Sequence, residues 1–298
     1  MRIRRFAIAA CHIALLAGFS GKAAAQQELT WAIPPFPPAY IEEHGEITGY
    51  AAQTQQWLMD RLPQYHHVAK RVPLARLLAE MRSDELRCSL TLIPTEERKE
   101  YIYFAKPIMI SLAPSVIVLK RQLPAFRPYL NARNEVELDR LLDDISMNVA
   151  LRHGRSYGEF IDKIVARHRS QTNIITVGSD EKFIQLLEMG RLDWAMYLPT
   201  EAEYHHRKAN TPGEILSLPI ANAKPYIEAT MGCSKTRAGK QAIEDVNAIL
   251  DAYPQRPWLR FYQAWVPPGD RVRYRQMLET VTTTRLTQAD PAEEPASQ

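Results

Sequence analysis

Residues Cys88–Lys120 read CSLTLIPTEERKEYIYFAKPIMISLAPSVIVLK. The stretch opens with a short apolar run, 89–93, which predicts a strand buried on both faces. Thr95 then offers an N-cap for a helical turn, because two glutamates follow in the first turn, where they suit the helix dipole. An aromatic patch at 101–104 and a second apolar strand at 115–119 complete the segment. It therefore predicts two buried strands with a capped helical turn between them.

This stretch resembles the signature of the solute-binding proteins of ABC transporters, in the family that includes the polar amino-acid binders. There, a strand ends in a small-residue turn, followed by T-x-x-R, an aromatic residue, F-S-x-P-Y and a strand that leads to the hinge. The matching residues here are Thr95, Arg98, Tyr101, Phe104 and Pro107. The resemblance covers nearly all of the chain after residue 25. It implies an α/β fold of the type II periplasmic-binding-protein kind, with two lobes joined by a two-strand hinge.

Residues 1–25 have the pattern of a secretory signal. Three arginines lie within the first five residues, an apolar run covers 6–19, and 23–25 offers an A-x-A cleavage site. The apolar run is too short for a comfortable membrane span. We therefore expect cleavage after Ala25 and a periplasmic protein. A lipoprotein box at 8–11 is the alternative, but cleavage there would leave almost no apolar segment before Cys11.

The charge balance makes nucleic acid an unexpected partner. The chain has 37 Lys and Arg against 34 Asp and Glu, a net charge of +3. Loss of residues 1–25 removes four bases and no acid, which leaves 33 bases against 34 acids and a net charge of −1. No basic stripe with interleaved aromatics is visible. The resemblance implies a small-molecule ligand and an ABC permease or membrane sensor as partners, and we expect a monomer without a cofactor.

The hydrophobic pattern alternates between strands and helices, which favours mostly parallel, doubly wound sheets. A first lobe is expected over 27–119 plus 224–268. Its strands are expected at 29–33, 66–72, 89–93, 115–119 and 227–231, and its helices at 51–62, 74–83, 240–253 and 258–265.

A second lobe is expected over 120–223, where the composition changes and another α/β pattern follows. Its strands are expected at 148–151, 174–177 and 192–197, and its helices at 135–145, near 157–168 and at 180–189. The chain then returns to the first lobe through 215–226. Residues 269–298 should form a C-terminal helix and a tail that is polar and disordered beyond Leu286.

Arg98 is the foremost candidate for holding a ligand. Its planar guanidinium matches the fork of a carboxylate, and a partly desolvated site strengthens such a pair. In the amino-acid binders, the matching arginine holds the α-carboxylate of the ligand. The ordinary alternative is a surface salt bridge with Glu97 or Glu100.

Four more residues of the first lobe are candidate ligand contacts. Thr91 matches a position where the family uses a small or hydroxyl-bearing residue, and Thr95 lies in the same segment. The proline-rich run 34–38 cannot continue a strand, because proline lacks the N–H, and it holds Phe36 out. Phe36 matches the aromatic residue that stacks on the ligand in the family, and Tyr40 lies just beyond. Ordinary packing is the alternative for both rings.

The second lobe offers its own contacts at a helix N-terminus, where free N–H groups and the helix dipole favour an anion. The candidates are Arg155, Ser156, Tyr157 and Tyr197. The family carries v-G-x-x-x-G-[ST] and then G-x-x-D-A at matching places. Gly154 and Ser156 fit the first pattern, and Gly190 and Asp193 fit the second.

Two departures from the family pattern bear on the ligand. The amino-acid binders hold the ligand's ammonium with a carboxylate at the position of Leu198, and many carry an aspartate near the position of Ile33. Without either carboxylate, the ammonium of an α-amino acid would be poorly paired, which is costly. Glu201 is a possible substitute. The sequence therefore favours an anionic or aromatic small molecule, with an amino acid as the alternative.

Two cysteines remain after cleavage, Cys88 and Cys233, and an even count in an oxidising compartment permits one disulfide. The resemblance puts Cys88 on one strand of the first lobe and Cys233 on the neighbouring antiparallel return strand. It therefore implies a bond between them, with two buried free thiols as the alternative.

Two enzymatic hypotheses remain open. The run 154–158 is a literal G-x-S-x-G between a strand and a helix, with Asp193 and His205 following in hydrolase order, which would make the chain a serine esterase. No HGGG-like oxyanion loop accompanies it. A dehydratase on the same fold would need a general acid in the cleft, for which Glu201 and His153 are candidates.

The chain also has two adjacent histidine pairs, 66–67 and 205–206. Neighbouring side chains diverge in a strand, and neither pair has a third ligand at convincing spacing. No metal site is expected.

Overall fold

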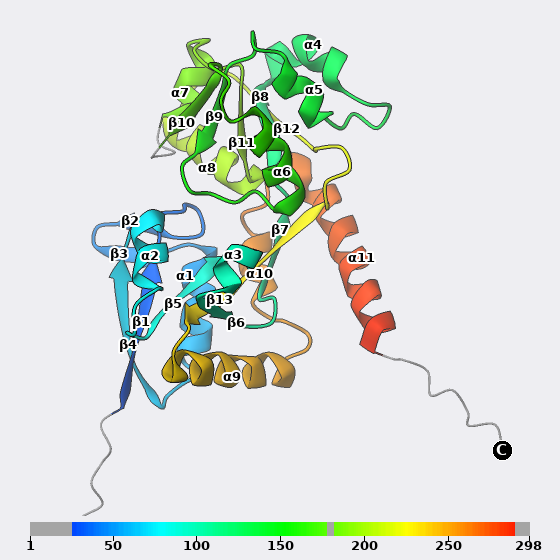
Figure 1. Cartoon of the computed structure of the whole chain (residues 1–298). Helices are drawn as coiled ribbons and strands as arrows, with labels where there is room; N and C mark the ends of the chain where they lie inside the picture. The colour runs from blue at the N-terminus through cyan, green and yellow to red at the C-terminus, as the bar shows by residue number, and fades with distance from the viewer. Residues whose placement is uncertain (1–25, 178–181, 290–298) are drawn as a thin grey trace, which may run out of the picture.

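The computed structural model describes residues 26–177 and 182–289, with side chains described through residue 281. Two α/β lobes lie one above the other in Figure 1, and the chain crosses between them twice. The expected two-lobe α/β architecture is confirmed.

Lobe 1 is built on a mixed sheet with the order β4-β1-β5-β13-β6, and β7 pairs with another part of β13. β1 runs parallel to β4 and β5, whereas β13 runs antiparallel to β5, β6 and β7. The strands are β1 (Gln27–Ile33), β4 (Tyr65–Arg71), β5 (Arg87–Leu92), β6 (Ile102–Phe104), β7 (Met109–Leu112) and β13 (Tyr226–Ser234). The helices are α1 (Tyr50–Met59), α2 (Leu74–Glu80), α3 (Glu96–Lys99), α9 (Arg237–Ala252), α10 (Leu259–Gln263) and α11 (Arg271–Ala289).

Lobe 2 is a second sheet with the order β10-β9-β11-β8-β12, in which β9, β10 and β11 are parallel and β8 is antiparallel to both of its neighbours. The strands are β8 (Ser115–Leu119), β9 (Val149–Arg152), β10 (Ile174–Val177), β11 (Trp194–Tyr197) and β12 (Ile215–Leu218). The helices are α4 (Leu123–Phe126), α5 (Leu138–Asp143), α6 (Glu159–His168), α7 (Phe183–Glu188) and α8 (Pro199–Ala209).

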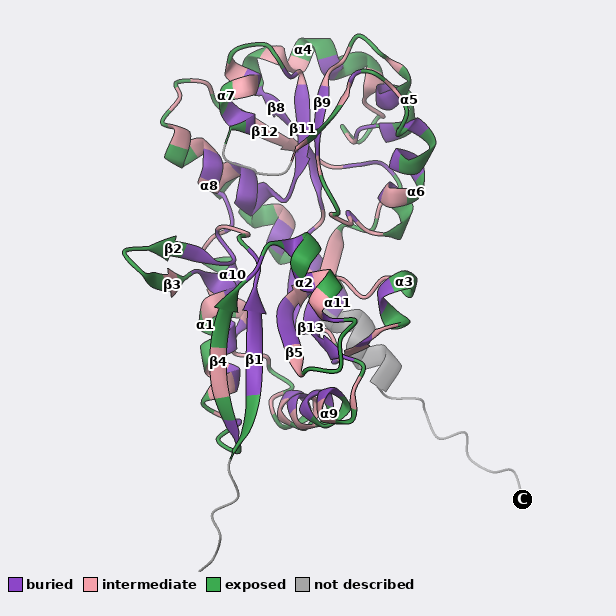
Figure 2. Cartoon of the chain, turned by 60° about the vertical axis from the view of Figure 1, so that its left-hand side comes forward, coloured by how far each residue is buried: buried purple, intermediate pink, exposed green. Residues whose placement is uncertain are grey.

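The central strands of the lobe 2 sheet, β8 and β11, are buried on both faces, as nearly continuous apolar runs require. Along β8, Val116 and Val118 pack into one hydrophobic cluster, while Ile117 and Leu119 pack into another on the opposite face. Figure 2 shows the central strands of both lobes in the colour of buried residues, whereas the tips of β2 (Ile41–Glu43) and β3 (Glu46–Thr48) are exposed.

The first crossing between lobes comes earlier than expected. Residues 115–119 were expected to end lobe 1, but β8 hydrogen-bonds to β11 and β12 in the sheet of lobe 2. Pro114 lies between β7 and β8, where its missing N–H interrupts the ladder. The chain returns through 219–225, and the N–H of Ala113 donates to the carbonyl of Pro225 at 3.1 Å. The two crossing segments therefore lie side by side and form the hinge.

Several elements differ from the expected ones. The segment 41–48 forms a hairpin whose two-residue turn, His44 and Gly45, has positive φ at both positions, as a type I′ turn requires. The helix α8 was not foreseen. α11 continues to Ala289, past Leu286, where the tail was expected to be disordered. The first residues of the helix expected at 180–189 lie outside the described residues.

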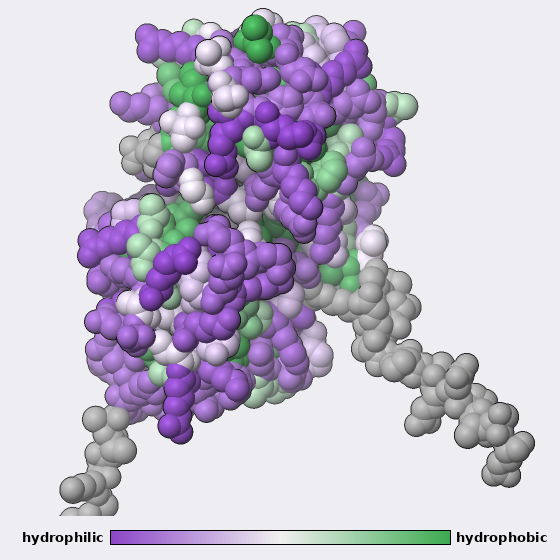
Figure 3. All heavy atoms as spheres, viewed as in Figure 1, coloured by the Kyte–Doolittle hydropathy of each residue, from purple (hydrophilic) through white to green (hydrophobic). Residues whose placement is uncertain are grey.

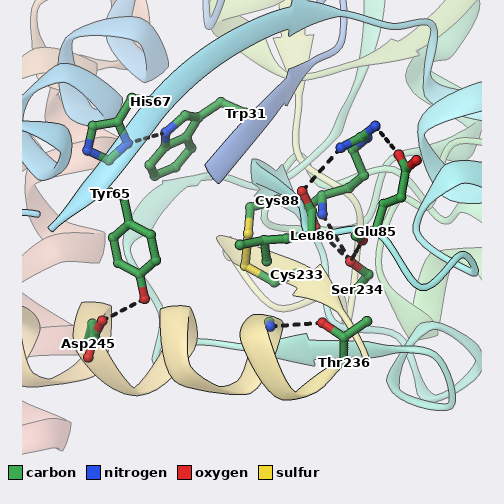
Figure 4. The surroundings of a disulfide bond; sticks show 12 residues. Trp31, Tyr65, His67, Glu85, Leu86, Cys88, Cys233, Ser234, Thr236 and Asp245 are labelled. Carbon is green, nitrogen blue, oxygen red and sulfur yellow. Dashed lines mark hydrogen bonds and ion pairs between the residues drawn. A yellow bond between two sulfur atoms is a disulfide. The ribbon is translucent and has the colours of Figure 1, made fainter. Parts of the chain in front are cut away.

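The predicted disulfide between Cys88 and Cys233 is confirmed. The two residues face each other across β5 and β13, and both are fully buried. Figure 4 shows the bond above the first turn of α9. Thr236 caps that helix by accepting a hydrogen bond from the N–H of Gly239 at 2.9 Å. The return strand is thus fixed to lobe 1 both covalently and through its hydrogen bonds.

Candidate interlobe ligand site

Two cavities lie between the lobes, at the carboxyl ends of strands from both sheets. Ligands of open α/β sheets bind in this position. A small cavity of about 60 Å³ is lined by Phe36, Ala39, Tyr50, Leu74, Thr91, Leu92, Ile93, Arg98, Met109, Ser111, Arg155, Ser156, Leu198, Glu201, Ile227 and Ala229. A large cavity of about 610 Å³ is lined by Ile33, Pro34, Pro35, Pro37, Tyr40, Ile41, Glu42, Ile47, Arg71, Arg152, Gln185, Tyr204, His205, Lys208 and Ala209.

The surface where the two lobes meet is less hydrophilic than their outer faces. In Figure 3 the outer faces of both lobes are mainly hydrophilic, whereas pale and hydrophobic residues gather where the lobes meet. Arg98 and Glu201, which line the small cavity between the lobes, are buried, and removal from water strengthens the interaction of such groups with an opposite charge.

Arg98 reaches the small cavity from the short helix α3. As predicted, Thr95 caps that helix, and its hydroxyl accepts a hydrogen bond from the N–H of Arg98 at 3.3 Å. Nη1 of Arg98 donates to the carbonyl of Ile93 at 3.0 Å, which aims the guanidinium back across the end of β5. The turn thus fixes the backbone N–H of Arg98 and one guanidinium nitrogen, Nη1.

The environment of Arg98 is that of a buried cation rather than a surface ion pair. The residue is 7% exposed, and Glu97 pairs with Arg82 at 3.2 Å instead. Burial lowers the pKa of the Arg98 guanidinium, and nearby groups that include Asp162 of lobe 2 oppose that shift. Arginine nevertheless stays charged at neutral pH. Among the described residues Arg98 makes no ion pair with a carboxylate, so its charge is available to a ligand.

Thr91 supplies a second polar group to the same cavity. Its Oγ1 is buried and has no hydrogen-bond partner among the described residues. A buried hydroxyl without a partner is costly, so such an atom in a cavity wall points to a missing ligand or water. Thr91 and Arg98 come from opposite ends of one strand-turn segment, and the structure brings both to the small cavity.

Lobe 2 contributes a buried ion pair that the sequence did not reveal. Nη2 of Arg155 lies 2.8 Å from Oε2 of Glu201, and the two side chains are 10% and 5% exposed. Glu201 lies in the first turn of α8, where Oε2 also accepts the N–H of Leu198 at 3.2 Å, as the third residue of a capping box does. The pairing leaves one positive charge, Arg98, in excess in the wall of the small cavity.

Phe36 lies between the two cavities. Its ring lines the small cavity, while its neighbours Pro35 and Pro37 line the large one. The guanidinium carbons of Arg152 and Arg155 each lie 5.8 Å from the centre of the Phe36 ring. At this range a guanidinium and an aromatic ring attract each other, so Phe36 of lobe 1 contacts two cations of lobe 2.

The three tyrosines that were predicted to contact a ligand are all buried. Tyr40 is 4% exposed; it contributes to the wall of the large cavity while its hydroxyl donates to Oε1 of Gln55 at 2.9 Å. Tyr157 is 3% exposed, and its hydroxyl accepts the N–H of Arg152 at 2.8 Å. Tyr197 is fully buried and stacks on Phe183. Tyr157 and Tyr197 line neither cavity, so both support the site from behind.

The residues of the two enzymatic hypotheses have other contacts. Ser156 lines the small cavity, but its hydroxyl donates to the carboxylate of Asp162, which also accepts the N–H of Tyr157. Asp193 accepts the N–H of Asn148 at 2.7 Å. His153 is exposed and lines neither cavity. The serine and the aspartate of the proposed esterase triad therefore each serve local structure.

Across 26–177 and 182–289, no group of three or more His, Cys, Asp or Glu side chains could hold a metal ion. Within the same residues no helix combines the length and apolar character that crossing a membrane requires.

The fold of this chain is similar to that of several solved structures. No protein-family model matches the sequence, and no curated protein matches it. An ancestral arginine-binding protein bound to arginine is similar at a TM-score of 0.59 and 15% identity, over 81% of this chain and 99% of that chain. EhuB in complex with hydroxyectoine has a TM-score of 0.62 and 16% identity, over 79% and 87% of the two chains.

A third similar structure is a histidine kinase sensor domain described as similar to periplasmic binding proteins. Its TM-score is 0.61 at 14% identity, over 79% of this chain and 94% of that chain. Identities this low establish the fold alone. Together with the strand orders of the two sheets and the cavities between them, they show that this chain has the two-lobe fold of the periplasmic binding proteins.

Proposed function

We propose that the chain is a periplasmic solute-binding protein that captures a small carboxylate-bearing ligand between its lobes for uptake by an ABC permease. The observation that carries the proposal is Arg98, a buried cation in the cavity wall with no carboxylate partner among the described residues. A ligand carboxylate would accept two parallel hydrogen bonds from its fork. The partnerless hydroxyl of Thr91 adds a donor in the same cavity.

Capture would work by closure of the two lobes about the paired crossing segments. A ligand held by Arg98 of lobe 1 would also contact Ser156 and Leu198 of lobe 2, which line the same cavity. Because only the closed state makes both sets of contacts, the ligand would stabilise closure. Glu201 is already paired with Arg155, so an ammonium group would find its carboxylate partly neutralised. This pairing favours an organic acid over an α-amino acid.

A thermal-shift panel on the exported protein tests the proposal, with amino acids, organic acids, aromatic acids and small oligopeptides as candidate ligands. A ligand at about 1,000 times its Kd should stabilise the protein by about 4 kcal/mol. Arg98→Gln should weaken binding by about tenfold to a hundredfold, because a charge-assisted hydrogen bond contributes about 1.5–3 kcal/mol.

The matched control is Arg82→Gln, which removes an exposed arginine that pairs with Glu97 but lines neither cavity. Its ligand shift should equal that of the unmodified protein. A ligand whose affinity survives Arg98→Gln would leave the fold intact but refute the anchor.

The alternative role is a sensor or accessory protein on the same fold. The similarity to a histidine kinase sensor domain supports this alternative, because that domain matches this chain as well as the arginine-binding protein does. The genes beside this one distinguish the roles: a permease gene supports uptake, and a membrane kinase gene supports sensing.

A further inference from the structure

The wall of the small cavity is rich in hydroxyl groups. Four of its described residues carry one: Tyr50, Thr91, Ser111 and Ser156. The one carboxylate among them, that of Glu201, is paired with Arg155. A hydroxyl both donates and accepts hydrogen bonds, so this wall suits a ligand that carries a hydroxyl beside its carboxylate. This inference rests on the proposed capture function and concerns the second polar group of the ligand.

Thr91 carries the hydroxyl that gains most from a ligand. Its Oγ1 is buried and makes no hydrogen bond within the part of the chain that the structure describes. The hydroxyl of Ser156, by contrast, already donates to the carboxylate of Asp162. A buried hydroxyl without a bond costs free energy, so a ligand that bonds to it removes that cost. A hydrocarbon group at the same place would leave the cost in full.

Thr91 and the guanidinium of Arg98 meet at the end of β5. Thr91 is the last residue but one of that strand, and Nη1 of Arg98 donates at 3.0 Å to the carbonyl of Ile93, two residues further along. Alternate residues of an extended chain point to the same face and lie about 7 Å apart. One short ligand can therefore reach both groups. A carboxylate on Arg98 brings its adjoining carbon, rather than a remote one, towards Thr91.

The size of the small cavity limits the ligand to a short chain. Its volume is about 60 Å³, the share of about two water molecules in the liquid. Apart from the charged and hydroxyl-bearing residues its described wall is apolar, and Met109, Leu198, Ile227 and Ala229 belong to this part. Such a wall stabilises a methyl or ethyl group and disfavours a further charge. The cavity therefore suits an acid of about two to four carbons.

An α-amino acid would bring an ammonium where a hydroxy acid brings a hydroxyl. A buried ammonium needs an opposite charge, because it loses its hydration and can only donate hydrogen bonds. Glu201 is the one carboxylate among the described lining residues, and it lies 2.8 Å from Arg155. A neutral hydroxyl satisfies Thr91 without adding a charge to the cavity. The wall therefore favours the hydroxyl over the ammonium.

We propose that the ligand is a short 2-hydroxy monocarboxylic acid. Its carboxylate is held by the guanidinium of Arg98, and its hydroxyl forms a hydrogen bond with Oγ1 of Thr91. Its alkyl group contacts the apolar side chains of Met109 and Ile227. Thr91 thus selects the hydroxy acid over the unsubstituted acid of the same length, while Arg98 anchors both.

Isothermal titration calorimetry of the exported protein tests the proposal. The probes are glycolate, the two enantiomers of lactate and 2-hydroxybutyrate, each paired with acetate, propionate or butyrate of the same length, and glycine and alanine. The best hydroxy acid should bind at least about tenfold more tightly than its unsubstituted partner, because only the hydroxy acid satisfies Thr91. Thr91→Val keeps the shape of the side chain but lacks the hydroxyl, and the ratio of the two affinities should fall to about one. Thr91→Ser keeps the hydroxyl and should retain the preference.

Thr176→Val is the matched control, because Thr176 is an exposed strand residue on β10 that lines neither cavity. Its binding should match that of the unmodified protein. Equal affinity for hydroxy and unsubstituted acids, with dependence on Arg98, would overturn the hydroxyl contact and leave the capture function standing. A preference that survives Thr91→Val would overturn the assignment to Thr91. Tighter binding of alanine than of lactate would overturn the ligand class, and so would an Arg98-dependent ligand from the wider thermal-shift panel when no short acid binds.

Discussion

At the scale of single residues, the ion pair between Arg155 and Glu201 should be energetically coupled far more strongly than a surface pair. Both side chains are nearly buried, and removing one partner of a buried pair costs about 3–5 kcal/mol. Urea denaturation of Arg155→Gln, Glu201→Gln and the double variant gives the coupling energy. The double variant should be more stable than the sum of the single losses predicts.

The exposed pair of Lys163 and Glu159 in the same lobe provides the control for that cycle. The two residues are four apart on α6 and lie 2.7 Å from each other, but both are largely exposed. Their coupling should be about 0.3–0.5 kcal/mol. A coupling energy between Arg155 and Glu201 no larger than this would contradict the prediction that burial strengthens their interaction.

The site was predictable from the sequence where its residues lie close together in the chain. Thr95 and Arg98 belong to one turn, so the N-cap and the arginine three residues later form a pattern that is visible in the sequence itself. Glu201 was considered only as a substitute ligand contact or a general acid, because its partner Arg155 lies in another element and α8 was not foreseen. The signals for α8 were present as Pro199 at the first helical position and a glutamate two residues later.

At the scale of elements, β5 and β13 depend on their disulfide for much of their stability. The bond closes a loop with a sequence separation of 145, and a bond across a loop of this size stabilises a protein by up to about 5 kcal/mol through restriction of the unfolded chain. Cys88→Ala combined with Cys233→Ala should lower the urea midpoint accordingly. Reductant should lower the midpoint of the unmodified protein to that of the double variant and leave the variant unchanged. Equal midpoints with and without reductant in the unmodified protein would contradict this role.

Element types were predicted more reliably than their place in the fold. An apolar run such as 115–119 reads as a buried strand whichever sheet it joins, because its periodicity does not specify its neighbours. The structure assigns it to lobe 2 through pairing with β11 and β12. The hairpin of β2 and β3 was missed because strands of three residues leave almost no alternation to detect.

At the scale of the whole molecule, stability should fall steeply in alkali. Burial raises the pKa values of Tyr40, Tyr50 and Tyr262 above the usual 10.0. The folded protein therefore binds these protons more tightly than the unfolded chain does. Stability is fully present below pH 10 and is lost as pH rises through the folded-state pKa values, by about 1.4 kcal/mol per pH unit for each group.

A jump to high pH, followed by phenolate absorbance, provides the measurement. These three tyrosines should ionise only as fast as the protein unfolds, so a slow absorbance phase should coincide with the change in tryptophan fluorescence. Ionisation of every tyrosine within the mixing time would contradict the burial of these phenols.

The closed loop made by the disulfide has a consequence for how the protein withstands proteolysis. Every residue of lobe 2 lies between Cys88 and Cys233, so the whole lobe is an insertion within one covalent ring. A protease that cuts any exposed segment of lobe 2 opens the ring but separates nothing. The two halves of lobe 1 remain joined through sulfur and through β13, and a nicked molecule keeps both walls of its cleft.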